Sequence, residues 1–176
     1  MISMTPRIYE VEKIGSGFLA VMARPVSGEW IEDEFSGLAK LDILQIVSLL
    51  KPSEEYEVGL TFEKALCKKN NINFISYPIE DRGLPTSIKE FSTLTKTIYD
   101  EIAGGMNTVI HCRAGIGRTG IVAAGVLLHA AFEVTEAFER ISKARGVQVP
   151  DTQEQYNWVL ANKNEIISNE KNSLRP

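Results

Sequence analysis

The sequence predicts a single α/β domain in which a mainly parallel central sheet is flanked by helices. Its 176 residues are enough for one compact domain with its own core. Short apolar segments alternate along the chain with longer segments whose apolar residues recur at helical spacing, an alternation typical of a parallel sheet covered by helices. We expect one domain over residues 1–168 and a frayed tail over residues 169–176.

Five segments are expected to be strands. The first two, 7–14 and 18–23, are joined by a Gly-Ser-Gly turn. The other three are short and mostly apolar, as is typical of buried strands, and they cover residues 43–50, 72–79 and 107–112.

Helices are expected between and after these strands. Ser87 and Glu90 have the spacing of a capping box, which predicts that one helix starts at Ser87. Asp151 and Glu154 have the same spacing and predict a second cap. The polar segment 80–87 is expected to be a loop. The expected helices cover residues 29–41, 53–71, 87–103, 117–132, 135–145 and 151–168.

Composition limits the classes of partner. The net charge of −4 and the pI of about 5.3 argue against a nucleic-acid or anionic-membrane binder. No apolar run is long enough to cross a bilayer, and the first residues lack the apolar stretch of a signal peptide. Two cysteines are too few for a disulfide framework, which favours a reducing, cytoplasmic location. Because the sequence has only two histidines in addition to these two cysteines, neither a metal site nor a cofactor is expected.

The segment VIHCRAGIGRTGI (109–121) joins a predicted strand to a predicted apolar helix. Backbone N–H groups of such a loop and the helix N-terminus would point toward one spot and form an anion site. Arg118 can bind two oxygens of one anion, and Cys112 would lie at the bottom of the cradle, where N–H dipoles stabilise a thiolate. Three glycines let the backbone approach a ligand closely, namely Gly115, Gly117 and Gly120.

Two other interpretations fit parts of this segment. A lone cysteine is usually a small buried hydrophobic residue, and a bare Cys-x5-Arg spacing often arises by chance. GIGRTG (115–120) also fits the dinucleotide-binding pattern. Only 56 residues follow Gly120, however, and the acidic residue expected about 20 positions on would fall near Glu139, inside a predicted helix. We therefore favour the phosphate cradle.

Three motifs carry a resemblance to a known family. HCRAGIGRT (111–119) resembles the His-Cys-x5-Arg-Ser/Thr signature of the cysteine-dependent protein tyrosine and dual-specificity phosphatases. YPIEDRGLP (77–85) resembles the general-acid loop of the small dual-specificity, kinase-associated and tensin-type members, and VPDTQEQYNWV (149–159) resembles their segment of water-positioning glutamines. The resemblance implies a small phosphatase domain with the phosphotyrosine-phosphatase-like fold.

The chemistry that this resemblance implies is hydrolysis of phosphomonoesters through a phosphocysteine intermediate. Cys112 would be the nucleophile. Asp81 would be the general acid, with Glu80 as the alternative carboxylate. The phosphate oxygens would be bound by the Arg118 side chain and by the loop residues Arg113, Ala114, Gly115, Ile116, Gly117 and Arg118.

Supporting roles are implied for three further residues. His111 would be a supporting hydrogen-bonding residue instead of a general base, Thr119 would donate to the thiolate, and Gln155 matches the second glutamine of the water-positioning motif. In deep-pocket tyrosine phosphatases a glutamine precedes the threonine of that motif, whereas here Asp151 precedes Thr152. Asp151 is first of all a candidate helix N-cap.

Cys67 has two interpretations. In some tensin-type and kinase-associated relatives, a cysteine in this stretch captures the oxidised nucleophile as a disulfide, which protects it from over-oxidation. Such a bridge to Cys112 needs Cα atoms within roughly 7 Å of each other, or a loop that moves. The other interpretation is a small buried residue on the apolar face of a helix.

The implied substrate is a phosphorylated protein or peptide, carrying phosphotyrosine and also phosphoserine or phosphothreonine as candidates. One alternative is a phosphoinositide or inositol phosphate, and another is a non-catalytic phosphate-binding module. Tensin-type lipid enzymes carry lysines inside the loop, whereas here Arg113 is basic and Ile116 is not, which favours proteins. The presence of Cys112, Arg118 and Asp81 argues against a non-catalytic module.

Overall fold

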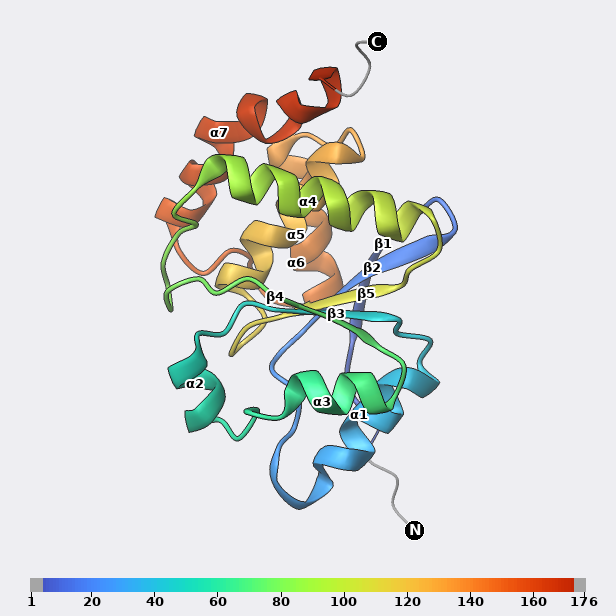
Figure 1. Cartoon of the computed structure of the whole chain (residues 1–176). Coiled ribbons are helices and arrows are strands. Elements are labelled where there is room, and N and C mark those ends of the chain that lie inside the picture. Colours follow the sequence, from blue (N-terminus) through green and yellow to red (C-terminus); the bar gives the residue numbers. More distant parts are fainter. Residues whose placement is uncertain (1–4, 173–176) are drawn as a thin grey trace.

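A five-stranded sheet forms the centre of the computed structural model, which describes the backbone of residues 5–172 and the side chains of residues 5–168 (Figure 1). The strand order is β1-β2-β5-β3-β4. β1 (Tyr9–Ile14) pairs antiparallel with β2 (Gly17–Met22), with a bulge between Glu10 and Glu12. The remaining pairs are parallel, which confirms the predicted mainly parallel sheet; they involve β2, β5 (Thr108–His111), β3 (Gln45–Ser48) and β4 (Asn73–Ser76).

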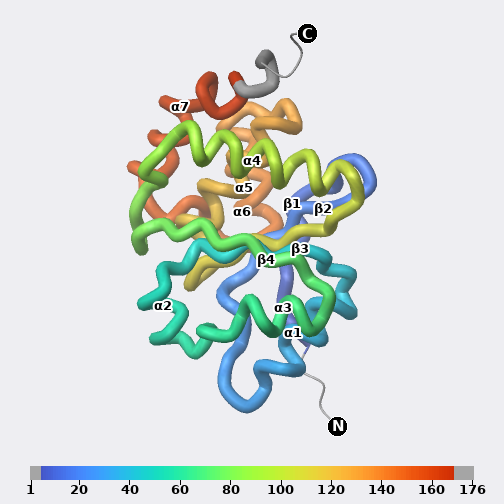
Figure 2. The backbone as a smooth tube through the Cα atoms, viewed as in Figure 1, coloured from blue at the N-terminus to red at the C-terminus, as the bar shows by residue number. Residues whose placement is uncertain are grey.

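Helices cover both faces of this sheet (Figures 1 and 2). One face carries the short 3-10 helix η1 (Gly28–Trp30), α1 (Ile31–Lys40), α2 (Pro52–Glu57) and α3 (Glu63–Lys69). The other face carries α4 (Ile88–Ala103), α5 (Gly117–His129), α6 (Val134–Arg145) and α7 (Gln153–Asn172).

Each face packs its own hydrophobic core. Val109 and Ile110 are neighbours on β5 yet belong to different clusters of buried residues, because successive side chains of a strand point to opposite faces. α5 lies inside the larger cluster and is buried from Arg118 to His129. This burial explains why its sequence is almost entirely apolar instead of amphipathic.

Three expected helices differ from those observed. The segment 53–71 forms two helices, α2 and α3, because the chain takes a left-handed turn at Gly59 (φ +73°) after α2. The helix expected over 117–132 ends at His129. The helix expected over 151–168 starts at Gln153 and extends to Asn172; the last four residues of the predicted frayed tail lie outside the described part of the chain.

The cap of α7 corrects the prediction made for Asp151 and Glu154. The backbone N–H of Gln155 donates to Thr152 Oγ1 at 3.1 Å, and the N–H of Thr152 donates to Gln155 Oε1 at 3.2 Å. The reciprocal cap is therefore shifted by one residue, to Thr152 and Gln155. The shift leaves Asp151 outside the cap.

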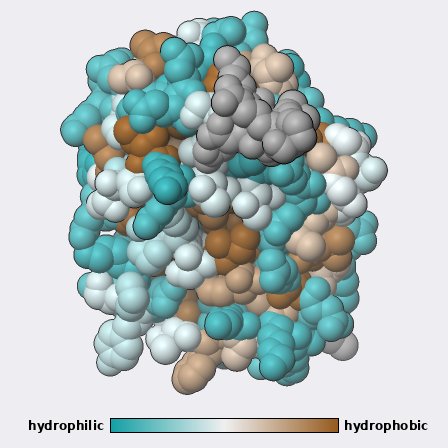
Figure 3. Space-filling model, turned by 45° about the horizontal axis from the view of Figure 1, so that its top comes forward, coloured by the Kyte–Doolittle hydropathy of each residue, from teal (hydrophilic) through white to brown (hydrophobic). Residues whose placement is uncertain are grey.

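No helix within the described part of the chain is long and apolar enough to cross a membrane. On the face drawn in Figure 3, hydrophobic residues form several separate patches between hydrophilic ones.

The ends of the parallel strands determine where a ligand can bind. All four parallel strands end at the same edge of the sheet, with β5 in the middle. The segments that follow β5, β4 and β3 carry, respectively, the loop 112–116, the polar loop 77–87 and α2. This edge is where ligands bind in open α/β sheets.

Candidate active site

The loop between β5 and α5 lines a pocket of about 230 Å³. Cys112, which is 3% exposed, lies directly after the central strand and lines this pocket. Among the described residues, no backbone hydrogen bond is donated by the N–H groups of residues 113–117, so they are available to an anion. The pocket is lined by Asp81, Arg82, Cys112, Arg113, Ala114, Ile116, Gly117, Arg118, Asp151 and Gln155.

The shape of the loop depends on contacts with two other segments. Gly115 has φ +73°, and a Cβ atom there would lie 2.3 Å from the carbonyl oxygen of Met22, at the end of β2. A Cβ atom on Gly117 would lie 3.0 Å from the side-chain amide of Gln155, and one on Gly120 would lie 2.4 Å from Val149. These glycines therefore allow close packing within the protein as well as approach to a ligand.

Arg118 is 2% exposed, and both terminal nitrogens of its guanidinium group donate hydrogen bonds within the protein. It donates to both carboxylate oxygens of Glu54, at 2.8 and 3.0 Å. It also donates to the carbonyl oxygen of Ile79 at 3.0 Å and to Asp81 Oδ1 at 3.0 Å. Arg118 is thus fixed at the pocket wall before any ligand binds.

Glu54 is a site residue that the sequence did not reveal. Its side chain lies in the first turn of α2, in a polar stretch that reads as an ordinary surface helix. Burial raises the pKa of Glu54, but hydrogen bonds from Arg118 and the Lys51 N–H, with the charges of Arg118 and Arg113, hold it below its usual value. An ionised Glu54 therefore anchors Arg118.

A second buried pair lies behind the loop. His111 and Glu63 are 0% and 1% exposed, and His111 Nε2 lies 2.6 Å from Glu63 Oε1. His111 Nδ1 lies 3.2 Å from the carbonyl oxygen of Cys112. The ring of His111 is therefore held on both sides, by the Glu63 carboxyl group and by the backbone of Cys112. The pair ties the loop to α3, a contact that the sequence did not predict.

Asp81 and Glu80, the two candidate carboxylates, occupy different surroundings. Asp81 lines the pocket and accepts a hydrogen bond from Arg118. Glu80 pairs with Lys51 at the surface and is not among the pocket residues. The geometry therefore favours Asp81 as the group that can reach a bound ester.

Gln155 and Thr119 have buried side chains close to the loop. Gln155 lines the pocket, and its Nε2 donates to the carbonyl oxygen of Gly83 at 3.4 Å, which links the cap of α7 to the loop that carries Asp81. Thr119 is 0% exposed, and its Oγ1 has no hydrogen-bond partner among the described residues. The role of Thr119 toward the Cys112 thiolate stays a prediction.

Cys67 lies in α3, in the smaller core cluster, whereas Cys112 belongs to the larger cluster across the sheet. Both thiols are unpaired. Burial, and then the charge of Glu63, raise the pKa of Cys67 to about 12. The redox role of Cys67 stays a prediction.

No group of three metal-binding side chains is present within the described residues.

Comparisons with known proteins agree with this geometry. A sequence model of the PTP-SAK "Swiss Army Knife" DSP-PTPase phosphatase domain matches residues 9–170. Human protein tyrosine phosphatase type IVA 3 is 26% identical over 88 residues; the match covers 49% of this chain and half of that protein.

Solved structures of phosphatases share the fold. Kinase associated phosphatase, in a form whose catalytic-site cysteine is replaced by serine, superposes with a TM-score of 0.83 at 21% identity, covering 95% of this chain and 98% of that one. PTPMT1 superposes with a TM-score of 0.75 at 16% identity, covering 94% and 99%. The phosphatase-type fold expected from the three motifs is confirmed.

Proposed function

The chain belongs to the DSP-PTPase phosphatase domain family, and from this premise we propose that it hydrolyses phosphotyrosine, and also phosphoserine or phosphothreonine, in proteins. One observation carries the proposal. Cys112 lies in a small pocket beside free backbone N–H groups and a buried, anchored Arg118, with Asp81 lining the same pocket. A phosphate dianion fits this combination of donors and nucleophile.

The first step transfers the phosphoryl group to the protein. The Cys112 thiolate attacks phosphorus, forming an S–P bond while the bond between phosphorus and the ester oxygen breaks. Asp81, protonated, gives its proton to the departing oxygen. The loop N–H groups and Arg118 stabilise the charge on the three remaining oxygens.

The second step returns the protein to its starting state. A water molecule attacks phosphorus, Asp81 takes the proton from that water, and the S–P bond breaks to release inorganic phosphate and the thiolate. Thr119, whose buried hydroxyl has no partner among the described residues, donates to the leaving thiolate. Gln155 helps to position the loop that carries Asp81 through Gly83.

Turnover of p-nitrophenyl phosphate tests the proposal. We expect hydrolysis in the presence of a chelator, inhibition by vanadate, and no turnover by Cys112→Ser, which should still bind phosphate. Full activity of Cys112→Ser, or loss of wild-type activity in the chelator, would refute the mechanism.

The substrate class is tested by phosphate release from phosphotyrosine peptides, phosphothreonine peptides and inositol lipids. The absence of lysine from the loop supports a peptide preference. We also propose a cytoplasmic location, since a reducing compartment keeps the Cys112 nucleophile as a thiol. Faster turnover of the lipids than of every peptide would overturn the substrate assignment.

A further inference from the structure

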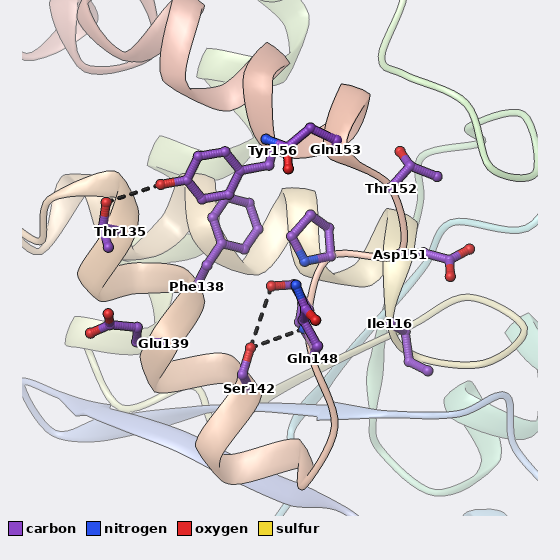
Figure 4. Close-up of a pocket in the computed structure, with 12 residues that line it drawn as sticks. Ile116, Thr135, Phe138, Glu139, Ser142, Gln148, Asp151, Thr152, Gln153 and Tyr156 are labelled. Atoms are coloured by element: carbon purple, nitrogen blue, oxygen red, sulfur yellow. Dashed lines mark hydrogen bonds between the residues drawn. The ribbon is translucent and has the colours of Figure 1, made fainter.

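A second cavity, a groove of about 600 Å³, adjoins the proposed catalytic pocket. The two cavities share Ile116 and Asp151 as lining residues, so a molecule whose phosphate lies over Cys112 can extend into the groove. Figure 4 shows Ile116 and Asp151 on one side of the groove and Glu139 on the other, with the rings of Phe138 and Tyr156 packed together above Glu139 in this view. The groove thus begins where the phosphate site ends.

The walls of this groove are fixed by contacts within the protein. The rings of Phe138 and Tyr156 pack with centroids 5.1 Å apart, and the hydroxyls of Tyr156 and Thr135 lie 2.9 Å apart. Ser142 Oγ accepts from the Val149 N–H at 2.9 Å and donates to the Val149 carbonyl at 3.3 Å. These contacts connect α6 with α7 and with the segment between them, so the groove is formed without a ligand.

The charges of the two cavities are opposite in kind. The lining of the catalytic pocket has three arginines, Arg82, Arg113 and Arg118, against two aspartates, Asp81 and Asp151, so its net charge is positive. The described lining of the groove includes two carboxylates, Glu139 and Asp151, and no lysine, arginine or histidine. Asp151 lies 3.8 Å from Arg82, whereas Glu139 is exposed and has no ion-pair partner among the described residues. A dianion in the pocket and a cation in the groove would complement this pattern.

We propose that the groove binds a lysine or arginine side chain of the phosphorylated substrate, close in its sequence to the phosphorylated residue. The aliphatic stem packs along Phe138 and Tyr156, and the cationic head lies near Glu139. This inference rests on the proposed phosphatase function and names the substrate class more narrowly: phosphopeptides with a basic flanking residue. The negative charge of Glu139 should also repel ligands whose second phosphate would lie in the groove.

Three phosphotyrosine peptide series test the groove, with lysine, glutamine or glutamate placed in turn at each flanking position. For wild-type protein we expect a kcat/KM about fivefold higher with lysine than with glutamine at the best position, carried mainly by KM. Glu139→Lys should reverse the preference, so that glutamate becomes the best residue there. Glu154→Lys, the same charge change at an exposed position outside the groove, should leave the preference unchanged.

Hydrolysis of p-nitrophenyl phosphate separates the two claims. This substrate is too small to reach the groove, so Glu139→Lys and Glu154→Lys should both hydrolyse it at the wild-type rate. Equal rates with all three peptide series, a preference for glutamate, or an unchanged preference in Glu139→Lys would overturn the groove assignment while leaving the phosphatase function intact. If no substrate is hydrolysed, the proposed phosphatase function is wrong. Fluorescence anisotropy then tests the groove separately, by comparing the affinities of the labelled lysine and glutamate phosphopeptides for the wild type and for Glu139→Lys.

Discussion

At the scale of single residues, the buried ionisable side chains around the loop 112–116 occur in pairs. Arg118 is paired with Glu54, and His111 with Glu63, and all four side chains are at least nine-tenths buried. A buried charge without a partner is strongly destabilising, and removing one member of such a pair typically costs about 3–5 kcal/mol. These pairs fix the side chains around the loop 112–116 from two sides.

The first prediction concerns acid stability. Because the pKa of Glu54 is held below its usual value of 4.5, its ionised form stabilises the fold above that pH, and the stabilisation is lost as pH falls through the folded-state pKa. Wild-type protein should therefore be more stable than Glu54→Gln near neutral pH, with the difference shrinking below about pH 4.5. Urea denaturation at a series of pH values measures this difference.

Glu55→Gln is the matched control in the same helix. Burial, and then the charge of Glu63, raise the pKa of Glu55, so Glu55 binds a proton more readily in the folded protein than in the unfolded chain. The contribution of Glu55 to stability is present when the pH is below the usual glutamate pKa, and it is lost as pH rises through the raised pKa of the folded protein. The wild type should gain stability relative to Glu55→Gln on acidification; the same trend in both variants would contradict the assignment.

The second prediction concerns the two neighbouring carboxylates. Asp81→Ala should slow turnover of alkyl phosphates by roughly 10²–10⁴, because a poor leaving group needs a proton. The turnover rate of aryl phosphates that release an acidic phenol should fall much less. Steady-state kinetics over a series of leaving groups measures the contrast, with Glu80→Ala as the control. If Glu80→Ala shows the steep dependence instead, the acid has been assigned to the wrong residue.

At the scale of secondary-structure elements, the loop between β5 and α5 depends on the end of β2. The N–H of Arg24 donates to the carbonyl of Arg113 at 3.0 Å, and Gly115 packs against the backbone of Met22. On the other side, Arg145 of α6 donates to the carbonyl of Ala114 at 2.9 Å. The loop is therefore held from both sides by elements distant in the sequence.

The third prediction separates two costs of replacing a glycine. Gly115 and Gly146 both have positive φ, but a Cβ atom clashes with backbone only at Gly115, since the space around Gly146 is open. Gly146→Ala should cost about 1 kcal/mol of stability from the left-handed conformation alone. Gly115→Ala should cost roughly 1–3 kcal/mol more and lower kcat, because the loop must shift. Thermal unfolding and turnover of both variants test this; equal losses would mean that the contact with Met22 is unimportant.

At the scale of the whole molecule, the sheet separates two cores and the two cysteines within them. The larger core packs against the side of the sheet that carries α4 to α7, and the smaller one against α1 and α3 (Figure 1). Cys112 lines a pocket at the sheet edge, whereas Cys67 is 0% exposed inside the smaller core. The fold therefore presents one thiol to reagents and shields the other.

The fourth prediction is selective alkylation. Iodoacetamide at neutral pH should modify Cys112 and leave Cys67 unmodified, because the raised pKa and full burial of Cys67 keep it protonated and inaccessible. Vanadate should protect Cys112. Peptide mass spectrometry identifies the modified residue, and the urea-denatured protein, in which both thiols should react, is the control. Early modification of Cys67 in the folded protein would show that the smaller core opens.

The sequence alone determined the α/β class, the parallel sheet and the loop that carries Cys112 and Arg118, because alternating apolar segments and a short glycine-containing motif are local patterns. Only the tertiary structure decided which side chains surround that loop. Glu54 and Glu63 read as polar surface residues of one helix, yet each lies in its own helix and is buried against a basic side chain of the segment 111–118. The groove beside the pocket likewise combines α6, α7 and the segment between them. Charge pairing and pocket shape depend on which distant residues folding brings together. The periodicity of apolar residues along the chain does not contain that information.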